Sequence, residues 1–172
     1  NVLINGAGGG VGTLGIQILK SYDVKVAGVD SGEKLGLLKS LGFDSVIDYK
    51  KVDFTDTGEK YDFILDAKSN RSVFKYARSL KKNGTYVTVG GSMNRLFEIF
   101  LLGSLIALFT GKKLSVLSHK PNKGLDQISE LVEKGQIIPV VDGPWEFDKI
   151  PELIQYLGEG KHVGKIVVEI AK

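Results

Sequence analysis

The stretch Val2-Leu-Ile-Asn-Gly-Ala-Gly-Gly-Gly-Val-Gly12 joins a short apolar run to a turn that contains five glycines. Glycine has no Cβ, so the backbone can turn sharply and a ligand can approach it closely. Val11, Leu14 and Ile18 follow at helical spacing, which predicts a helix that begins as the glycines end. The first N–H groups of a helix and the positive end of its dipole attract anions. The stretch therefore predicts a strand, a turn and a helix that bind a diphosphate, as in a dinucleotide-binding domain.

The glycine pattern matches the dinucleotide fingerprint imperfectly. A strict Gly-x-Gly-x-x-Gly is absent, but Ala7-x-Gly9-x-x-Gly12 fits if alanine takes the first place. Gly6-x-x-Gly9-x-x-Gly12 fits a turn that is one residue longer. A glycine turn that serves packing alone stays open as an alternative.

An acidic residue follows at the spacing that such a fingerprint requires. Asp30 ends the apolar run 24–29 and lies 18 residues after Gly12, close to the ~20 expected for an acid that bonds the adenosine ribose. Asp30 also suits a turn or a helix cap, because Ser31-Gly32 follow it. The two roles are compatible.

The composition bounds the class of protein. With 172 residues, 42% hydrophobic and 25% charged, the chain is typical of one globular domain with an appendage. A net charge of +3 is too small to favour a nucleic-acid partner. The chain has no cysteine, which excludes disulfides and thiolate chemistry and suits a cytoplasmic protein. Its two histidines, His119 and His162, are expected in surface loops, so we expect no metal site.

The order of elements predicts the fold class. Strands are expected at 2–5, 25–29, 45–48, 61–66, 85–89 and 113–117, with helices at 11–21, 33–41, 72–80 and 96–109 between them. Alternating strands and helices imply parallel pairing with right-handed crossovers. We therefore expect an α/β doubly wound parallel sheet, the Rossmann fold, over residues 1–118. Residues 119–172 form a C-terminal segment with helices at 125–134 and 149–157, an extended stretch at 137–141 and a strand at 165–170.

Two features bear on partners. The apolar run 96–109 has 14 residues, fewer than the ~20 needed to span a bilayer, so it predicts a buried helix, a pocket wall or an interface and no transmembrane segment. If this run forms an exposed apolar interface, it also predicts a homo-oligomer. The chain begins at Asn1, already inside the first expected strand, so we expect it to be part of a longer protein whose N-terminal portion is missing.

Several motifs resemble one known family. The glycine turn is followed by Leu41-Gly-Phe-Asp-Ser-Val-Ile-Asp-Tyr49, Tyr61-Asp-Phe-Ile-Leu-Asp66 and Asn83-Gly-Thr-Tyr-Val-Thr-Val-Gly90. Leu131-Val-Glu-Lys-Gly-Gln-Ile-Ile-Pro139 and Gly158-Glu-Gly-Lys-His-Val-Gly-Lys-Ile-Val-Val-Glu169 complete the series. Together they resemble the medium-chain dehydrogenases/reductases, most closely the zinc-independent quinone oxidoreductase branch. The resemblance covers essentially the whole chain.

This resemblance implies an activity and a partner domain. It implies an NAD(P)H-dependent oxidoreductase that reduces a quinone, an enal or enone, or another carbonyl by hydride transfer, without a catalytic metal. It also implies an N-terminal GroES-like catalytic domain, missing here, against which residues 136–172 would pack. The chain alone is then expected to be inactive, and its catalytic residues stay unknown.

The candidate cofactor residues begin at the diphosphate. Gly9, Gly10 and Val11 are expected to offer backbone N–H groups to it, and Asp30 to accept from the ribose hydroxyls. A carboxylate there repels a 2′-phosphate, so NAD is favoured over NADP. Lys34 would act in the opposite direction if it reached that phosphate, although a solvated surface position is the simpler expectation.

The remaining candidates lie farther along the sheet. Tyr49 is expected either against the adenine or simply packed at the end of a strand. Ala67 and Gly90 would flank the nicotinamide, where small residues let the ring approach. The loop Ala67-Lys-Ser-Asn70 departs from the Val-Gly-Gly usual in the family, which leaves its cofactor contacts open.

Two other functions remain compatible with the residues. An S-adenosylmethionine-dependent methyltransferase shares the glycine turn and the acid that ends the second strand, but its turn usually starts from an acidic residue, where this chain has Asn5. A non-catalytic nucleotide-binding or interaction module is the third possibility.

Overall fold

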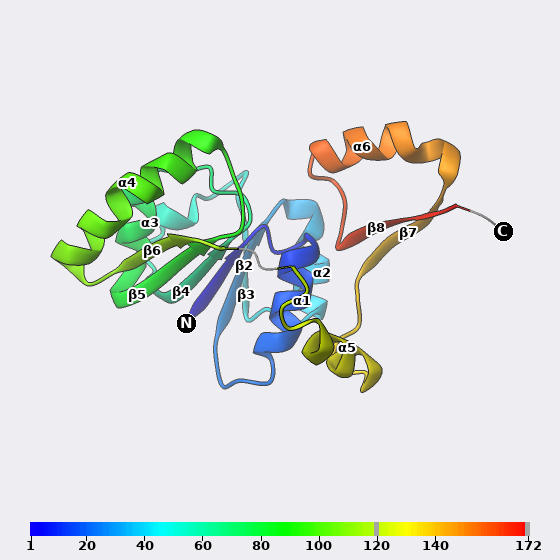
Figure 1. The fold of residues 1–172 in the computed structure, drawn as a ribbon, viewed down its shortest axis with the longest axis horizontal. Helices are drawn as coiled ribbons and strands as arrows, with labels where there is room; N and C mark the ends of the chain where they lie inside the picture. Colours follow the sequence, from blue (N-terminus) through cyan, green and yellow to red (C-terminus); the bar gives the residue numbers. More distant parts are fainter. Residues whose placement is uncertain (119–120, 171–172) are drawn as a thin grey trace.

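Six parallel strands form one sheet in the computed structural model, which describes residues 1–118 and 121–170 (Figure 1). The strands are β1 (Val2–Asn5), β2 (Val26–Asp30), β3 (Ser45–Asp48), β4 (Tyr61–Asp66), β5 (Leu80–Thr88) and β6 (Lys113–Val116). Their order across the sheet is β3-β2-β1-β4-β5-β6. The predicted doubly wound α/β fold is confirmed. The expectation for His119 falls outside the described residues.

The connections cover both faces of this sheet. Helices α1 (Gly10–Leu19) and α2 (Leu35–Ser40) lie on one face, and α3 (Val73–Ser79) and α4 (Met93–Thr110) lie on the other (Figure 1). The chain therefore winds outward from β1 in one direction and from β4 in the other. Between these two neighbouring strands the connecting loops diverge, which opens a crevice at their carboxyl ends.

The core follows from the alternation of side chains along buried strands. In β1, Val2 and Ile4 face α1 and α2, where they join Ile16 and Leu38 in one apolar cluster. Leu3 points the other way into the second cluster, beneath α3 and α4. Because both faces are covered, the strand reads as a continuous apolar run.

Helix α4 is longer than the apolar run suggested. It has 18 residues with a mean hydropathy of 1.5, so length and composition alone would allow it to cross a membrane, and only 11% of it is buried. The expectation that it is too short to span a bilayer was therefore wrong, because the helix continues past both ends of the run. Its inner face packs on the sheet through Ile99, Gly103 and Ile106. Its outer face exposes large apolar side chains, namely Met93, Phe97, Phe100, Leu101, Leu105, Leu108 and Phe109.

Three other boundaries differ from those expected. The helix expected at 33–41 is a 3-10 turn over Gly32–Lys34 followed by α2. The strand expected at 85–89 is β5, which begins earlier, at Leu80; its pairing with β4 is interrupted where the register shifts, and Asn83 there has φ +62°. The stretch expected to be extended, 137–141, leads into a strand that was not expected, β7 (Val141–Glu146).

Stretch 137–141 is held by a side chain of α1. The Gln17 amide donates to Ile138 O (3.0 Å) and accepts from Ile138 N–H (2.8 Å). Ile137, beside it, is 2% exposed. A side chain therefore satisfies the backbone groups that a neighbouring strand would otherwise pair.

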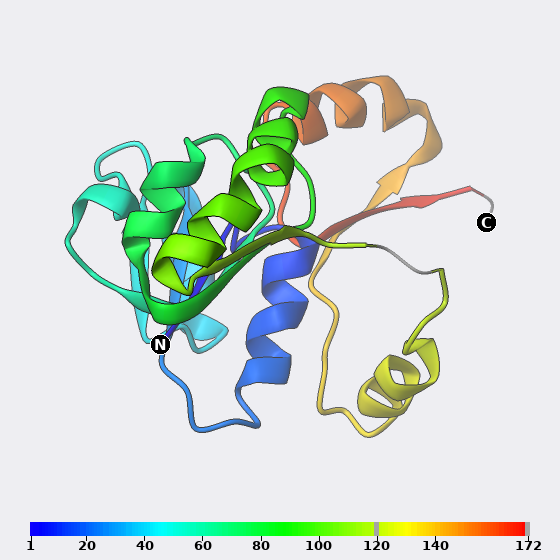
Figure 2. The ribbon, with the colours of Figure 1, turned by 60° about the vertical axis from the view of Figure 1, so that its left-hand side comes forward.

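The C-terminal portion forms a smaller unit beside the main sheet. It contains α5 (Leu125–Glu133), β7, α6 (Ile150–Gly158) and β8 (Lys165–Glu169), with β7 and β8 paired in parallel (Figure 2). The loop between α6 and β8 passes over the glycine turn, where Gly164 N–H donates to Gly8 O (2.8 Å). The division into residues 1–118 and 119–172 stays a prediction.

Asp53 anchors the loop that leaves β4. Its carboxylate accepts from Arg71 Nε (2.7 Å), Lys75 Nζ (3.2 Å) and Thr55 N–H (3.0 Å). Burial acts to raise the pKa of Asp53, but these hydrogen bonds outweigh it and lower the pKa from 3.8 to about 2. The charged form is thus favoured by folding, and it fixes Arg71 at the edge of the crevice.

We expect Asp53→Asn to destabilise the fold by about 1 kcal/mol at pH 7, after discounting for solvent screening. A folded pKa below the unfolded one gives stability that is present above pH 4 and is lost as the pH falls toward 2. Urea unfolding at pH 7 and pH 2 should therefore show the two proteins converging in acid. Asp56→Asn is the control, since that carboxylate is 58% exposed and, among the residues that the structure describes, pairs with Lys75 alone. An equal loss in both variants would contradict this account.

Candidate functional site

The glycine turn brings β1 and α1 closer together than any side chain would allow. A Cβ on Gly12 would lie 2.3 Å from Ala7 O, so the first turn of α1 lies against the backbone of the preceding loop. Gly6 has φ +85°, a left-handed conformation that favours glycine. These two glycines serve the fold, which bears out part of the packing alternative.

The free N–H groups of this turn belong to α1. Gly10 and Val11 are its first two residues and have no intrahelical acceptor. Gly9 N–H, in contrast, already donates to Gly6 O (3.2 Å). Gly9 was expected to donate to a ligand, but this N–H already has an acceptor; a Cβ there would meet Gly6 O at 3.5 Å, an ordinary van der Waals contact without a clash.

Asp30 and Lys34 form a buried pair behind the turn. Asp30 Oδ2 accepts from Gly8 N–H (2.7 Å), and Oδ1 accepts from Ser31 N–H (2.9 Å) and lies 3.5 Å from Lys34 Nζ. Both side chains are 7% exposed. The simpler expectation of a solvated Lys34 was wrong, because the residues that cover it come from another part of the chain: its ammonium donates to Gly160 O (2.6 Å).

Two basic residues at the start of β8 and in the loop before it also reach the glycine turn. Lys165 lies over Gly10, with its Cε 2.7 Å from the position of a Cβ there. His162 Nε2 lies 3.9 Å from the corresponding position on Gly9. His162 was expected in a surface loop; instead it is partly buried, and its Nδ1 has no hydrogen-bond partner among the described residues.

The charges around His162 affect its protonation. Burial lowers its pKa below 6.5, and the positive charges of Lys34 and Lys68 lower it further. Asp142 and Asp30 oppose this more weakly. Burial, together with the same lysines that would attract an anion, therefore lowers the pKa of His162 and favours its neutral form.

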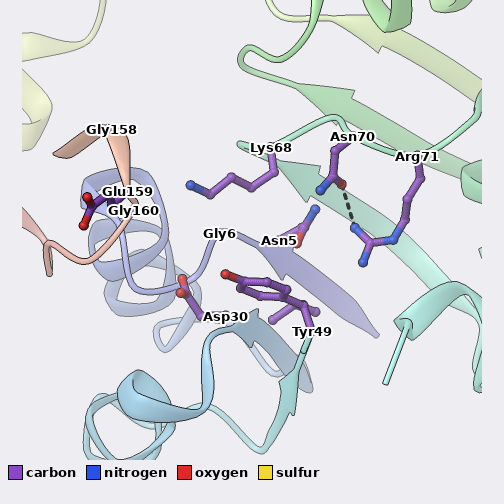
Figure 3. A pocket seen from close by; sticks show the side chains of 11 residues that line it. Asn5, Gly6, Asp30, Tyr49, Lys68, Asn70, Arg71, Gly158, Glu159 and Gly160 are labelled. Carbon is purple, nitrogen blue, oxygen red and sulfur yellow. Dashed lines mark hydrogen bonds between the residues drawn. The ribbon is translucent and has the colours of Figure 1, made fainter. Parts of the chain in front are cut away.

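Two pockets meet above these residues. The first, here called the glycine pocket, is lined by Gly6, Gly9, Gly10, Val11, Asp30, Lys34, Ala67, Lys68 and His162. The second, here called the strand-end cleft, is lined by Asn5, Gly6, Val29, Asp30, Tyr49, Lys68, Asn70, Arg71, Gly158, Glu159 and Gly160 (Figure 3). Both lie at the crevice that the sheet topology opens between β1 and β4.

The remaining candidate residues do not all line these two pockets. Tyr49 lines the strand-end cleft and is 47% exposed, so its ring has a free face. Ala67 lines the glycine pocket, while Gly90, beyond β5, lines neither pocket. In the sequence, Lys68 stands out only as a departure from the family pattern, and Lys165 does not stand out at all. No local signal marks them, because long-range packing brings them to the turn.

The described residues do not provide a metal site. The chain has no cysteine. Within residues 1–118 and 121–170, no three His, Asp or Glu side chains are grouped so that they could hold a metal ion. The donor set of the described residues therefore does not fit zinc.

Comparison with known proteins identifies the family. A family model described as zinc-binding dehydrogenase matches residues 41–168. The chain therefore belongs to this family, as a quinone oxidoreductase-like member of the medium-chain dehydrogenases/reductases.

The curated relatives are oxidoreductases. The chain is 33% identical over 172 residues to the 2-methylene-furan-3-one reductase of Solanum lycopersicum, covering 98% of this chain and 40% of that protein. It is 32% identical over 188 residues to the mitochondrial NAD(P)H oxidoreductase RTN4IP1 of Bos taurus, covering 98% and 48%. The chain thus spans less than half the length of these two relatives.

Solved structures agree on the fold. The quinone oxidoreductase from Coxiella burnetii superposes with a TM-score of 0.81 at 22% identity, covering 99% of this chain and 52% of that one. An NAD-dependent alcohol dehydrogenase superposes with a TM-score of 0.78 at 23% identity, covering 99% and 51%. At these identities the likeness concerns the Rossmann architecture alone.

Gly12→Ala tests the close approach of α1 to the turn. The added Cβ would overlap backbone atoms that cannot move independently, so we expect a loss of about 3 kcal/mol in the free energy of unfolding, measured in urea. Gly36→Ala in α2 is the control, because nothing lies within 4 Å of its Cβ position. That change should be neutral or stabilising by about 0.5 kcal/mol. Equal effects would mean that Gly12 is not required for packing.

Proposed function

We propose that this chain is the cofactor-binding part of an NAD(P)H-dependent oxidoreductase that reduces a quinone, an enone or another carbonyl. The observation that carries the proposal is the glycine pocket, where free N–H groups of α1 meet three basic side chains and one buried carboxylate. The family assignment and the names of the relatives support it. They favour the oxidoreductase function over the methyltransferase and the non-catalytic module.

The residues of the pocket suit a nicotinamide dinucleotide. The N–H groups of Gly10 and Val11 would bind the diphosphate, and Asp30 would accept from the ribose with its remaining lone pairs. Tyr49 would stack on the adenine in the strand-end cleft. The bound cofactor supplies a hydride from its nicotinamide ring, and the protein contributes position and electrostatics. Ala67 and Gly90 are proposed to leave room for that ring.

The choice between NADH and NADPH depends on the charge at Asp30. An isolated carboxylate would repel a 2′-phosphate, but this one bonds Gly8 N–H and pairs with Lys34. We therefore propose a weak preference for NADH, below tenfold, with the negative charge of Asp30 largely balanced by Lys34.

Three further proposals concern the context of the chain. An N-terminal GroES-like domain is proposed to supply the rest of the substrate pocket, so this chain alone would bind cofactor and turn over slowly. The apolar outer face of α4 is proposed to support a homo-oligomer, because exposed patches of this kind favour association. A cytoplasmic location stays a proposal.

Binding of NADH to Gly9→Val tests the cofactor site. Gly9 has φ −81° and ψ 175°, a backbone that valine adopts readily, and a Cβ there meets no atom closer than 3.5 Å among the contacts of the described residues. The branched side chain would fill the glycine pocket without disturbing the fold. We expect NADH affinity, measured by calorimetry, to fall by more than about 100-fold, roughly 2.7 kcal/mol. Unchanged affinity, or no NADH binding by the wild-type chain, would overturn the proposed function.

Cofactor preference is tested by titrating NADH and NADPH into the wild type and Asp30→Asn. The amide can still accept from Gly8 N–H, but it loses the bond from Ser31 N–H and leaves the Lys34 ammonium without its counter-charge. The repulsion of the 2′-phosphate is therefore lost. We expect NADH to bind the wild type more tightly, by less than about tenfold or 1.4 kcal/mol, and the order to reverse in the variant. Wild-type binding at least tenfold tighter for NADPH would contradict this preference.

A further inference from the structure

Lys68 stands where the two pockets meet. Only three residues line both the glycine pocket and the strand-end cleft among those that the structure describes: Gly6, Asp30 and Lys68. Gly6 has no side chain, and Asp30 is buried behind the turn. Lys68 is therefore the one long side chain at this junction within the described residues.

The side chain of Lys68 crosses the mouth of the site. Its Cγ and Cε lie 3.5 and 3.6 Å from the Cβ position of Gly6, and its Nζ lies 3.7 Å from the Cβ position of Gly160. It thus starts at the loop after β4, passes the glycine turn and ends near the loop after α6. Figure 3 shows it extended toward Gly160 above Asp30.

The ammonium group of Lys68 has no anionic partner here. Within residues 1–118 and 121–170, no carboxylate lies within 4.0 Å of its Nζ, although two carboxylates are nearby. Asp30 pairs with Lys34, and Glu159 pairs with Lys161 at 2.6 Å. A cation held next to the free N–H groups of α1 leaves an excess of positive charge at the mouth of the site.

The backbone that carries Lys68 is fixed. Asp66, fully buried, accepts from Lys68 N–H (2.8 Å) and Ser69 N–H (2.9 Å) with one carboxylate oxygen. That oxygen also accepts from Asn5 (2.8 Å), and Tyr86 donates to the other (2.9 Å). The loop is thus anchored to β1 and β5, while the lysine side chain beyond it stays exposed and able to move onto a ligand.

We propose that Lys68 is a cofactor-binding residue, whose ammonium group closes over the diphosphate of the dinucleotide from the β4 side. This inference rests on the proposed function. The ligand group it recognises is a diphosphate bearing two negative charges, which needs a counter-charge that the N–H groups of Gly10 and Val11 supply only in part. Lys68 provides it at the point where the diphosphate leaves the glycine pocket for the strand-end cleft.

The test compares NADH binding by the wild type, Lys68→Met, Lys68→Arg and Lys82→Met. Lys68→Met keeps the length of the side chain and removes its charge, so we expect about tenfold weaker binding with a smaller dependence on salt. Lys68→Arg should bind within about threefold of the wild type. Lys82→Met removes the same charge at the N-terminal end of β5, away from the carboxyl ends of the strands, and should leave NADH affinity unchanged.

Two smaller ligands locate the contact. Adenosine 5′-diphosphoribose carries the diphosphate and adenosine does not, so Lys68→Met should weaken binding of the first and leave the second unchanged. Equal affinities of Lys68→Met and Lys82→Met for NADH would overturn the inference while the proposed function stands. Absence of NADH binding by the wild type would overturn the proposed function itself, which keeps the two failures apart.

Proton NMR provides a readout that a purely structural role would not change. The chain has two histidines, so their titrations are readily separated. Removing the charge of Lys68 should raise the pKa of His162, and binding of adenosine 5′-diphosphoribose to the wild type should raise it as well. A His162 titration that is the same in Lys68→Met and the wild type would contradict the placement of this ammonium group.

Discussion

The hydrogen bond from Gly8 N–H to the buried carboxylate of Asp30 joins the ends of the first two strands, and the site depends on it. A charged acceptor makes this bond strong, and burial removes water as a competitor. It fixes the glycine turn from behind, so that α1 begins at Gly10 with its first N–H groups facing the crevice. Lys34 balances the charge and ties the same carboxylate to the loop after α6 through Gly160.

The charges above the turn follow from this arrangement. Lys34 is occupied with Asp30, whereas Lys68 and Lys165 approach the turn from separate parts of the chain. Each lies against one glycine: Lys68 against Gly6 and Lys165 against Gly10. Because glycine has no side chain, Gly6 and Gly10 leave room for a ligand as well as for the two lysines. Burial and the charges of Lys34 and Lys68 lower the pKa of His162, so its neutral form adds no further positive charge beside the turn.

The loop after β4 shows how stability and function share one set of contacts. Its two ends are held by buried or half-buried carboxylates, Asp66 on the sheet side and Asp53 through Arg71. A loop fixed in this way can present an exposed lysine at a constant place. The same contacts leave Ser69 fully buried with φ +42°, a conformation that costs energy and persists because its surroundings determine it.

The sequence by itself determined the fold class, the crevice and the resemblance to one family. These are local features: apolar runs of strand length, helical spacing after Gly12 and an acid at the end of the second strand. It also indicated Asp30 and Tyr49, because the carboxyl ends of parallel strands meet at one edge.

Only the tertiary structure decided that Lys34 is buried, that Gly9 N–H is occupied and that His162, Lys165 and Lys68 converge on the turn. Apart from the local bond of Gly9 N–H to Gly6 O, those facts depend on contacts between segments far apart in the chain, such as Lys34 and Gly160, which are 126 positions apart. A single sequence carries no periodic or spacing signal for such contacts. The outward apolar face of α4 was hidden for a related reason, since composition shows that a helix is apolar but not which side the sheet covers.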